Sequence, residues 1–345
     1  MTASVKTTIP LCVTVEDIYV AQKNIKSHVV CTPLLHCSTF SNLSGKNIFL
    51  KAENLQTSGS FKYRGAFNAI AHLLQSSEGK VKCVVTHSSG NHGQAIAKAA
   101  QAFNIPAFIV MPTTSPICKK SAVKSYGGVV VECEPTDQGR VNKAQEVCLE
   151  KNGYLIHASQ CNQVIAGQGT IAIEMLQQNP GLDAIVAPVG GGGMISGIAI
   201  AAKHIKPSIK IYAAEPETAN DCYLSKKNGF RTTLKHTPKT VADGVKTNIG
   251  EKTWPIIEQL VDDVILVTED EILSALKLIW ERSKLLAEPT SGVGVAAVVS
   301  DKFNQAKGTE RLQNVGVVVC GGNIDLNTIP TLLFHNKFQK SNAKE

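Results

Sequence analysis

Runs of valine and isoleucine alternate along the chain with stretches of helical periodicity, and no other feature restricts the possible folds as strongly. The apolar runs with the length and composition of strands are VKCVVTH (81–87), PAFIVMP (106–112), GVVVECE (128–134), DAIVAPVG (183–190), KIYAAEP (210–216) and NVGVVVCGGN (314–323). Helical patterns such as GQAIAKAAQAFN (93–104) separate them. Such repetition with short connections predicts parallel sheets covered by helices on both faces. We therefore predict an α/β protein of two lobes, each a mostly parallel twisted sheet flanked by helices.

Chain length, charge and cysteine spacing limit the partners and the location that we expect for this protein. The 345 residues suffice for two lobes, and the net charge of +7 comes from dispersed basic residues without interleaved aromatics, so we expect no nucleic-acid partner. No apolar run approaches the ~20 residues of a membrane span, and the amino-terminal stretch lacks a secretory pattern. We therefore expect no membrane partner and a cytoplasmic protein. The ten cysteines have no CxxC pair and no metal-finger spacing, which favours free thiols in a reducing compartment.

Lys62 lies between Phe61 and Tyr63 in SGSFKYRG (58–65), directly after a Ser-Gly-Ser turn. A lysine that only has to reach solvent gains nothing from two aromatic neighbours. Apolar surroundings disfavour the charged ammonium group and so lower the pKa of the amine. We expect Lys62 to be a partly desolvated, reactive amine.

Four consecutive glycines in PVGGGGMISG (188–197) follow a predicted strand and open a helix. Such a turn directs several backbone N–H groups at one anion, and the helix start adds positive potential. The run matches neither the dinucleotide nor the nucleotide-phosphate consensus. A compact phosphate cup therefore suits it better than a nucleotide loop, and a tight turn without a ligand is the plain alternative.

Two more strand ends carry glycines and polar side chains, in SSGNHGQA (88–95) and VCGGN (319–323). Open α/β sheets bind ligands at the carboxyl ends of their strands, although Ser88 or Asn91 could simply cap the following helix. A phosphate cup combined with a sheltered lysine indicates a phosphorylated aldehyde held as a Schiff base. Pyridoxal 5′-phosphate (PLP) fits that description.

Six motifs in fixed order extend across nearly the whole chain: GSFKYRG (59–65), HSSGNHGQA (87–95), AGQGT (166–170), PVGGGGM (188–194), AAEP (213–216) and CGGN (320–323). With them the chain closely resembles the serine racemase and serine/threonine dehydratase family, which has a tryptophan synthase β-like PLP fold. Periodicity alone leaves the first 78 residues unassigned. With the resemblance, we expect residues 1–78 and 159–345 to form a large PLP-binding domain and residues 79–158 a small mobile domain. The resemblance also implies a homodimer.

The cofactor contacts follow from the matched positions. The resemblance implies that PLP bonds covalently to Lys62 and is contacted by Phe61, Asn91, Gly190, Gly191, Gly192, Gly193, Met194, Gly244 and Cys320. The glycine run would donate N–H groups to the phosphate, Asn91 would bond the ring hydroxyl, and Cys320 would contact the pyridine nitrogen. A neutral thiol at that position leaves the ring nitrogen largely unprotonated and the ring a weaker electron sink than an aspartate would.

Ser89 and Cys320 point to different activities within the family. Racemisation needs a proton-transfer group on each face of the cofactor, and the resemblance implies Lys62 and Ser89 for these roles. Liver-type dehydratases usually carry alanine at the position of Ser89 and cysteine at that of Cys320. We expect a serine racemase that also eliminates water from serine to give pyruvate and ammonia. An L-serine/L-threonine dehydratase with little racemisation, an aspartate racemase and a non-catalytic amino-acid or PLP binder remain as alternatives.

The substrate, a small amino acid such as serine, would lie against Ser88, Ser89, Asn91, His92 and Arg140. The helix start near Asn91 favours the substrate carboxylate. Arg140 matches a mobile arginine of the family, or is an exposed arginine at a helix start. The loop HASQCNQVIAG (157–167) departs from the family pattern at Ala158 and Ser159, which leaves the exact substrate open.

A cation and a nucleotide complete the expectations. The resemblance places Mg²⁺ or Ca²⁺, with Mn²⁺ also suitable, at Glu215, Ala219 and Asp221, where a solvated loop is the plain alternative. It implies ATP as an activator at Ser38, Ser58, Gln94, Lys119, Tyr126, Lys284 and Asn323. Cys37 and Thr57 replace residues common in that nucleotide site, so activation by ATP could be weakened or lost.

Overall fold

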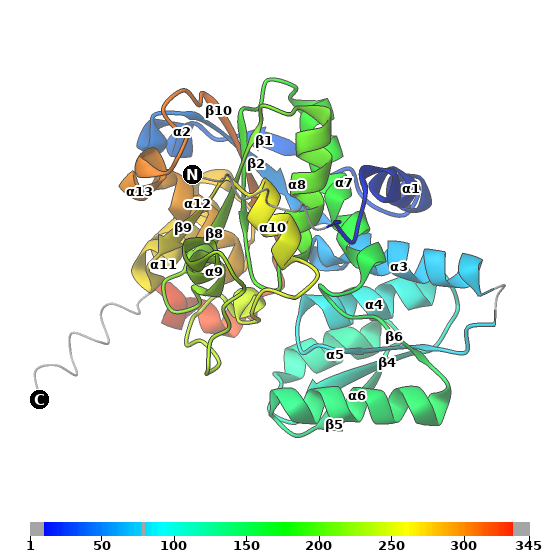
Figure 1. The fold of residues 1–345 in the computed structure, drawn as a ribbon. Helices are drawn as coiled ribbons and strands as arrows, with labels where there is room; N and C mark the ends of the chain where they lie inside the picture. Colours follow the sequence, from blue (N-terminus) through cyan, green and yellow to red (C-terminus); the bar gives the residue numbers. More distant parts are fainter. Residues whose placement is uncertain (1–9, 78–79, 334–345) are drawn as a thin grey trace, which may run out of the picture.

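The computed structural model describes residues 10–77 and 80–333 and folds them into two α/β lobes (Figure 1). One lobe contains a six-stranded sheet of order β1-β2-β10-β7-β8-β9, and the other a four-stranded sheet of order β5-β4-β3-β6. Within residues 10–77 and 80–333, every strand pairing is parallel except that of β1 with β2. The predicted class, a two-lobed α/β protein with mostly parallel sheets, is confirmed.

The larger sheet draws its strands from both ends of the chain. Its strands are β1 (Leu34–His36), β2 (Asn47–Ala52), β7 (Ala184–Pro188), β8 (Lys210–Pro216), β9 (Asp263–Val267) and β10 (Asn314–Val319). The strands of the smaller sheet are β3 (Val84–His87), β4 (Ala107–Pro112), β5 (Val129–Cys133) and β6 (Tyr154–Leu155). Because β2 pairs with β10, the amino-terminal strands belong to the larger sheet, which periodicity had left open.

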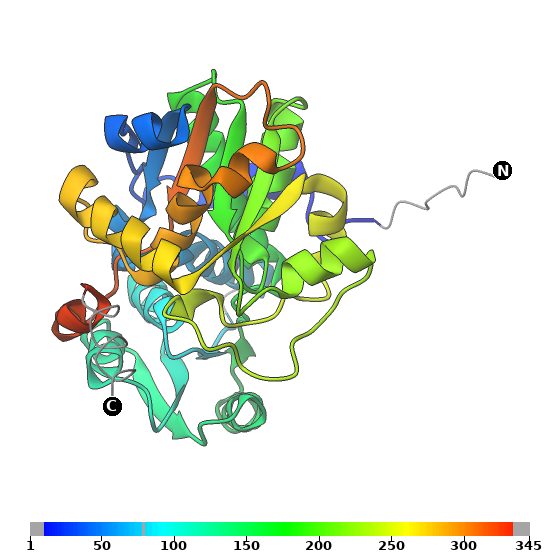
Figure 2. The ribbon, with the colours of Figure 1, turned by 90° about the vertical axis from the view of Figure 1, so that its left-hand side faces the viewer.

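The larger sheet is buried on both faces. Ile185 and Ala187 of β7 enter one core, and the alternate residues Ala184 and Val186 enter the other. Helices α1 (Val15–Ile25), α7 (Asn162–Gln178), α8 (Gly193–Ile205) and α10 (Trp254–Leu260) close the first core. Helices α2 (Ser38–Ser44), α11 (Glu269–Leu278), α12 (Pro289–Val299) and α13 (Asp301–Gln305) close the second (Figure 2). Burial on both faces explains why these strands read as continuous apolar runs rather than alternating ones.

The smaller sheet is covered in the same way. Helices α3 (Lys62–Ser76), α4 (Asn91–Ala102) and α5 (Ile117–Ser125) pack on one face, and α6 (Asp137–Lys151) packs on the other. The remaining regular segments are the helix α9 (Asp221–Asn228), the π-helical turn Ile279–Ser283 and the 3₁₀ turns Glu53–Leu55, Thr57–Gly59, Asp243–Val245 and Leu326–Thr328.

Helix α3 lies at the junction of the two lobes, packed against α4 on one side and α7 on the other. The contact with α7 is made backbone to backbone, because a Cβ on Gly167 would lie 2.6 Å from the Cα of Gly65. Lys62, the first residue of α3, is thereby held between the lobes. The predicted domain boundary after residue 78 lies outside the described residues, and the proposed division of the chain into domains stays a prediction.

A buried ionic cluster fixes the first turn of α3. Arg64 is completely buried and bonds Glu53 at 2.7 Å and Glu174 of α7 at 2.7 Å. Lys51 of β2 bonds the same Glu174 at 2.7 Å. Removing one member of such a cluster leaves an uncompensated buried charge and costs about 3–5 kcal/mol. The cluster therefore joins α3, α7 and the end of β2 in one arrangement.

Polar turns follow the carboxyl ends of β3, β7 and β10, and these turns carry most of the predicted cofactor and substrate residues. In the described part of the chain, no helix is both long and apolar enough to span a bilayer.

Candidate active site

Lys62 has the environment that its aromatic neighbours predict. It is half-buried, and its Nζ lies 4.9 Å from the ring centroid of Phe61. Burial lowers the pKa of the amine from 10.5 to about 8, while the charges of Cys320 and Glu288 act in the opposite direction. No salt bridge to Lys62 is present among the described residues. At neutral pH, its proton is therefore held far less firmly than that of an ordinary lysine.

The glycine turn between β7 and α8 has no room for side chains. A Cβ on Gly191 would lie 2.4 Å from Ser159 Oγ, and one on Gly192 would lie 2.7 Å from Thr253 Oγ1. Gly192 also has φ +82°, which L side chains rarely adopt. Within the described residues, the N–H groups of Gly190 to Gly193 have no hydrogen-bond acceptor. Free N–H donors at a helix start, in a turn stripped of side chains, fit a phosphate group.

Two residues that sequence reasoning did not assign support this turn. Thr253 Oγ1 donates to the carbonyl oxygen of Gly191 at 2.9 Å and accepts from the N–H of Gly250 at 2.9 Å. Ser159 is buried directly against Gly191 and Gly193. Thr253 follows the glycine run by about sixty residues without a motif of its own, so no local signal could have identified it. Ser159 was noticed only as a departure from the family pattern.

The turn after β3 brings Asn91 to the other lobe. Asn91 Nδ2 donates to Glu288 Oε1 at 2.8 Å and Oε2 at 3.0 Å, and its Oδ1 accepts from Asn323 Nδ2 at 2.9 Å. Neither Ser88 nor Asn91 caps α4, whose N-cap is Gly90 without a side-chain bond. The alternative interpretation of these residues as simple caps is therefore wrong. Asn91 instead connects α4 to Glu288, which sequence reasoning missed.

Ser89 and His92 have unused hydrogen-bonding capacity. The Ser89 side chain is half-exposed, and within the described ranges it makes no hydrogen bond. His92 is buried, with Nε2 3.0 Å from the carbonyl oxygen of Ile156 and Nδ1 without a partner. Burial, and then the charge of Lys62, lower the pKa of His92 to about 3, so its imidazole is neutral. Ser88 lies alongside, and its Oγ accepts from the N–H of Gly90 at 3.3 Å.

The turn after β10 is attached directly to the lysine segment. The N–H of Phe61 donates to the carbonyl oxygen of Cys320 at 3.0 Å, and Ser60 forms an antiparallel bridge with Gly321. Burial raises the pKa of the Cys320 thiol, which keeps it protonated. Cys320 Sγ lies 3.5 Å from the hydroxyl of Ser291. The thiol and the Lys62 amine are thus held in neighbouring segments.

The charge of Lys62 reaches two other predicted residues and Glu288, so these groups lie close together. The charge of Lys62 acts on His92, Cys320 and Glu288, which come from α4, the end of β10 and the start of α12. Glu288 is buried, which, together with the charge of Asp243, raises its pKa to about 7. Gly244, beside Asp243, donates its N–H to Thr290 Oγ1 at 3.0 Å.

Within the described residues, Arg140 makes no hydrogen bond or ion pair with this group. It is paired with Asp137 of its own helix, α6, and its charge reaches His87 at the end of β3. The structure thus places Arg140 near the carboxyl end of β3, beside the turn that carries Ser88 and Ser89.

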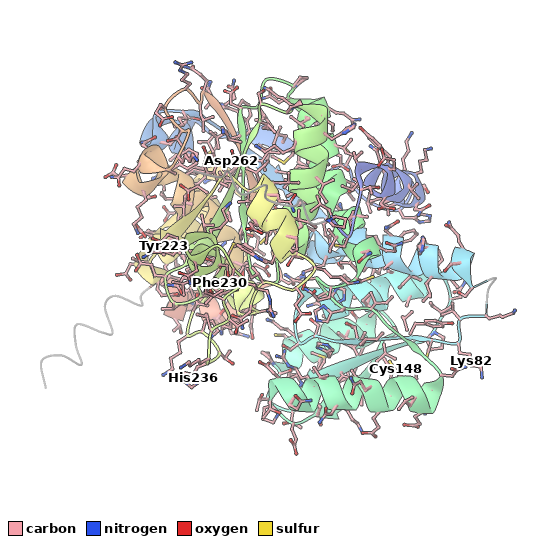
Figure 3. The ribbon with its side chains drawn as sticks, viewed as in Figure 1. Lys82, Cys148, Tyr223, Phe230, His236 and Asp262 are labelled. Carbon is pink, nitrogen blue, oxygen red and sulfur yellow. The ribbon has the colours of Figure 1, made fainter. Side chains whose placement is uncertain are left out.

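The predicted cation ligands are brought together and buried. Glu215 accepts the N–H groups of Cys222 at 3.0 Å and Tyr223 at 2.9 Å, and Asp221 accepts that of Ile249 at 2.7 Å (Tyr223 is labelled in Figure 3). Burial raises the pKa of Asp221 to about 6, and burial together with the Asp221 charge raises that of Glu215 well above its usual range. Ala219, which lies between these two residues in the sequence, is also buried. Two buried carboxylates of this kind fit a divalent cation. Their burial contradicts the plain alternative of a solvated loop.

The predicted nucleotide residues fall into separate groups. Asn323 Nδ2 donates to the carbonyl oxygen of Ser58 at 2.8 Å, and Gln94 is buried on the neighbouring α4. Lys119 of α5 pairs with Asp243, and Tyr126 ends the same helix. Ser38 and Lys284 directly follow Cys37 and Ser283 in the chain, and Cys37 Sγ lies 3.6 Å from Ser283 Oγ. No hydrogen bond or ion pair in the described residues joins the three groups.

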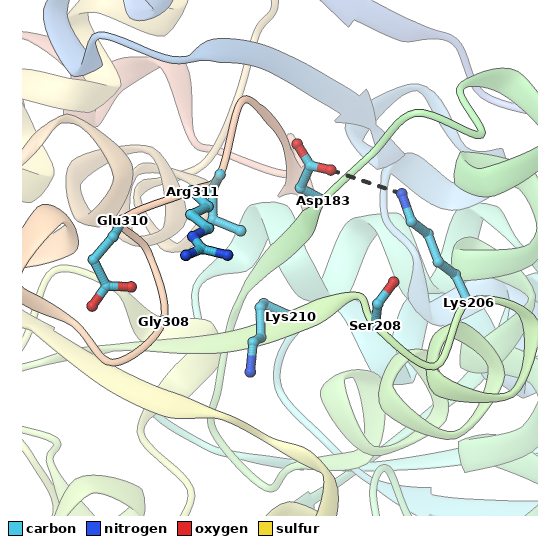
Figure 4. A pocket seen from close by; sticks show the side chains of 8 residues that line it. Asp183, Lys206, Ser208, Lys210, Gly308, Glu310 and Arg311 are labelled. Carbon is cyan, nitrogen blue, oxygen red and sulfur yellow. Dashed lines mark ion pairs between the residues drawn. The ribbon is translucent and has the colours of Figure 1, made fainter.

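A pocket of about 370 Å³ lies at the opposite edge of the larger sheet (Figure 4). Among its lining residues, Asp183, Lys210 and Leu312 lie at or just before the amino ends of β7, β8 and β10, and Lys206 directly follows α8. It contains none of the predicted site residues.

Comparison with known proteins places the chain in a family. The model of the pyridoxal-phosphate dependent enzyme family matches residues 25–321. Serine racemase of Rattus norvegicus is 53% identical over 319 residues, covering 92% of this chain and 95% of that protein. The human serine racemase is 52% identical over 91% of this chain and 92% of its own length.

Solved structures agree with this match. The structure of maize serine racemase has a TM-score of 0.89 at 40% identity and covers 95% of this chain and 99% of its own. A PLP-dependent aspartate racemase has a TM-score of 0.89 at 39% identity, with 93% and 99% coverage. The threonine deaminase of T.th. has a TM-score of 0.84 at 37% identity, with 91% and 99% coverage. The resemblance drawn from the six motifs is confirmed: the chain belongs to the family of pyridoxal-phosphate dependent enzymes and is similar over most of its length to the serine racemases.

Proposed function

We propose that this protein is a PLP-dependent amino-acid racemase that interconverts L-serine and D-serine and also eliminates water from serine. The observation that carries the proposal is Lys62, an amine with a pKa of about 8 that lies against Phe61 and has no ion-pair partner among the described residues. The serine racemases that match most of the chain support the choice of substrate.

The cofactor would be held by groups that reach the site from several segments. Lys62 would bond it covalently, and the free N–H groups of the turn Gly190–Gly193, with Met194, would bind its phosphate. Phe61, Asn91 and Cys320 would surround its ring, with Gly244 nearby. When bound, PLP withdraws electrons from the Cα of an attached amino acid and so makes the Cα proton acidic.

Side chains of the protein itself would transfer the protons. The Lys62 amine would take or return the Cα proton on one face, because its lowered pKa places it near the operating pH of a general base. The Ser89 hydroxyl, which makes no other hydrogen bond in the described residues, would serve the opposite face. Ser88, Asn91, neutral His92 and the start of α4 would hold the substrate carboxylate, with Arg140 at the edge of the site.

Elimination uses the same deprotonated substrate. Loss of the β-hydroxyl instead of return of the proton leads to pyruvate and ammonia. Cys320 favours this branch, and the threonine deaminase match supports it. An L-serine/L-threonine dehydratase with little racemisation is therefore the second candidate. Aspartate racemase activity is a third, supported by the match to such an enzyme at 39% identity.

We further propose a divalent cation, Mg²⁺ or Ca²⁺ with Mn²⁺ also suitable, at Glu215, Asp221 and the carbonyl of Ala219. The two buried carboxylates, with pKa values raised by burial, support it. ATP activation through Ser58, Asn323 and the other predicted residues, a homodimer and a cytoplasmic location are also proposals. The ten free thiols are consistent with a reducing compartment.

The test is to incubate the purified protein with L-serine, PLP and Mg²⁺, to resolve D-serine by chiral chromatography, and to assay pyruvate in the same tube. We expect both products from the wild type, and pyruvate without D-serine from Ser89→Ala. Pyruvate alone from the wild type would establish the dehydratase instead. Equal retention of both activities in Ser89→Ala would remove Ser89 from the mechanism. The same assay with L-aspartate in place of serine tests the third candidate, aspartate racemase activity.

A further inference from the structure

Ser291 lies in the first turn of α12, completely buried, and faces the turn that carries Cys320. Its Oγ is 2.8 Å from the carbonyl oxygen of Gly321, 3.1 Å from the N–H nitrogen of Gly321 and 3.5 Å from Cys320 Sγ. Three polar atoms of one turn thus contact the single hydroxyl of Ser291.

The single proton of the Ser291 hydroxyl determines the direction of each of these bonds. A serine hydroxyl has one proton to donate and two lone pairs that accept. The carbonyl oxygen of Gly321 has no proton, so the bond at 2.8 Å uses the proton of Ser291. The N–H of Gly321 occupies one lone pair of the same oxygen. The contact with Cys320 can then be a hydrogen bond only if the thiol donates its proton to Ser291.

We propose that Ser291 is a positioning residue of the candidate active site, whose hydroxyl accepts the thiol proton of Cys320 and so withholds it from the cofactor. The role toward the cofactor rests on the proposed function, in which Cys320 faces the ring nitrogen. The direction of the bond between Ser291 and Cys320 does not.

The surroundings keep the thiol proton in place. Cys320 is buried, which raises the pKa of its thiol, so that the S–H bond stays intact at neutral pH. Glu288, whose N–H donates to the carbonyl oxygen of Gly321 at 3.0 Å, and Lys62 are the charged groups that act on the thiol. Ser291 is thus a hydrogen-bond acceptor that competes with any ring nitrogen for this proton. A ring nitrogen that receives no such proton makes the bound cofactor a weaker electron sink.

The primary test measures the thiol itself in cofactor-free protein. The S–H stretching band of Cys320 is obtained by infrared difference spectroscopy, subtracting the spectrum of Cys320→Ser from that of the wild type. We expect a band shifted to low wavenumber, as for a donated thiol, and its return to higher wavenumber in Ser291→Ala. Ser300→Ala is the matched control, because Ser300 ends the same helix with a side-chain bond to the carbonyl oxygen of Ala297 at 2.8 Å. It should leave the band unchanged.

A band at the position of a free thiol in the wild type would overturn the proposal. This result needs no Ser291 variant, so the proposal stays testable if Ser291→Ala does not fold. An identical band in wild type and folded Ser291→Ala would overturn it as well.

The role toward the cofactor is tested by a double-mutant cycle in PLP-loaded protein. Ser291→Ala should shift the absorption maximum of the bound cofactor and change exchange of the Cα proton of L-serine with D₂O about fivefold, the equivalent of one ordinary hydrogen bond. In a Cys320→Ala background, Ser291→Ala should change neither the absorption maximum nor the rate of proton exchange. Equal effects in both backgrounds would reduce Ser291 to a structural support of Gly321. Failure of PLP to bind at all would refute the proposed function and leave the infrared result standing.

Discussion

Replacing Lys62 with methionine should stabilise the cofactor-free protein, because the amine is held where its charge is poorly solvated. Burial lowers the pKa of Lys62 from 10.5 to about 8. Because a pKa difference of one is worth 1.36 kcal/mol, this lowering corresponds to about 3 kcal/mol of unfolding free energy. Lys62 keeps some contact with solvent, which screens its charge, so we expect about 2 kcal/mol. Methionine has a similar shape and no charge to bury.

The sign of the pH dependence follows from the lowered pKa. Between pH 8 and pH 10.5, the unfolded chain binds this proton and the folded protein does not, so the Lys62 contribution to stability improves as the pH rises. The full penalty is present below pH 8. The difference in unfolding free energy between Lys62→Met and the wild type should therefore be largest at pH 7 and shrink to less than about 1 kcal/mol near pH 10.

Urea unfolding of both proteins without PLP, at pH 7 and at pH 10, measures this difference. Lys51→Met is the matched control. Lys51 is completely buried, but it bonds Glu174 at 2.7 Å and the carbonyl oxygen of Thr32 at 2.6 Å. Loss of the Lys51 amine leaves the Glu174 carboxylate without this partner and should destabilise the protein by about 3 kcal/mol. If Lys62→Met were no more stable than the wild type at pH 7, the amine would not be desolvated, and our account of its reactivity would fail.

Two further predictions concern the cofactor and the cation. Thr253→Val removes the donor to the carbonyl oxygen of Gly191 and loosens the glycine turn, so PLP affinity in a fluorescence titration should fall about fivefold; an unchanged affinity would show that the turn holds its shape without Thr253. Mg²⁺ should raise the melting temperature of the wild type, and EDTA should reverse this, because a ligand of the folded state stabilises it. Glu215→Gln should abolish this response, and a Glu215→Gln protein that still responds would place the cation elsewhere.

The sequence alone determined the features that depend on neighbours within a few residues. The β-branched runs predicted the strands, since a strand buried on both faces has to be apolar throughout. The residues around Lys62 indicated its desolvation, because Phe61 contacts it from the next position. The four glycines predicted an anion-binding turn, because a backbone that exposes adjacent N–H groups cannot carry side chains there.

The tertiary structure alone decided which distant residues meet. Thr253, Glu288 and Ser291 have no local motif, yet they contact the glycine turn, Asn91 and Cys320. Their positions depend on the strand order, which places the carboxyl ends of β7 and β10 side by side and brings α12 against both. Periodicity is a property of single elements and is the same for any order of the strands. The partners across the site were therefore fixed only by the packing of the whole chain.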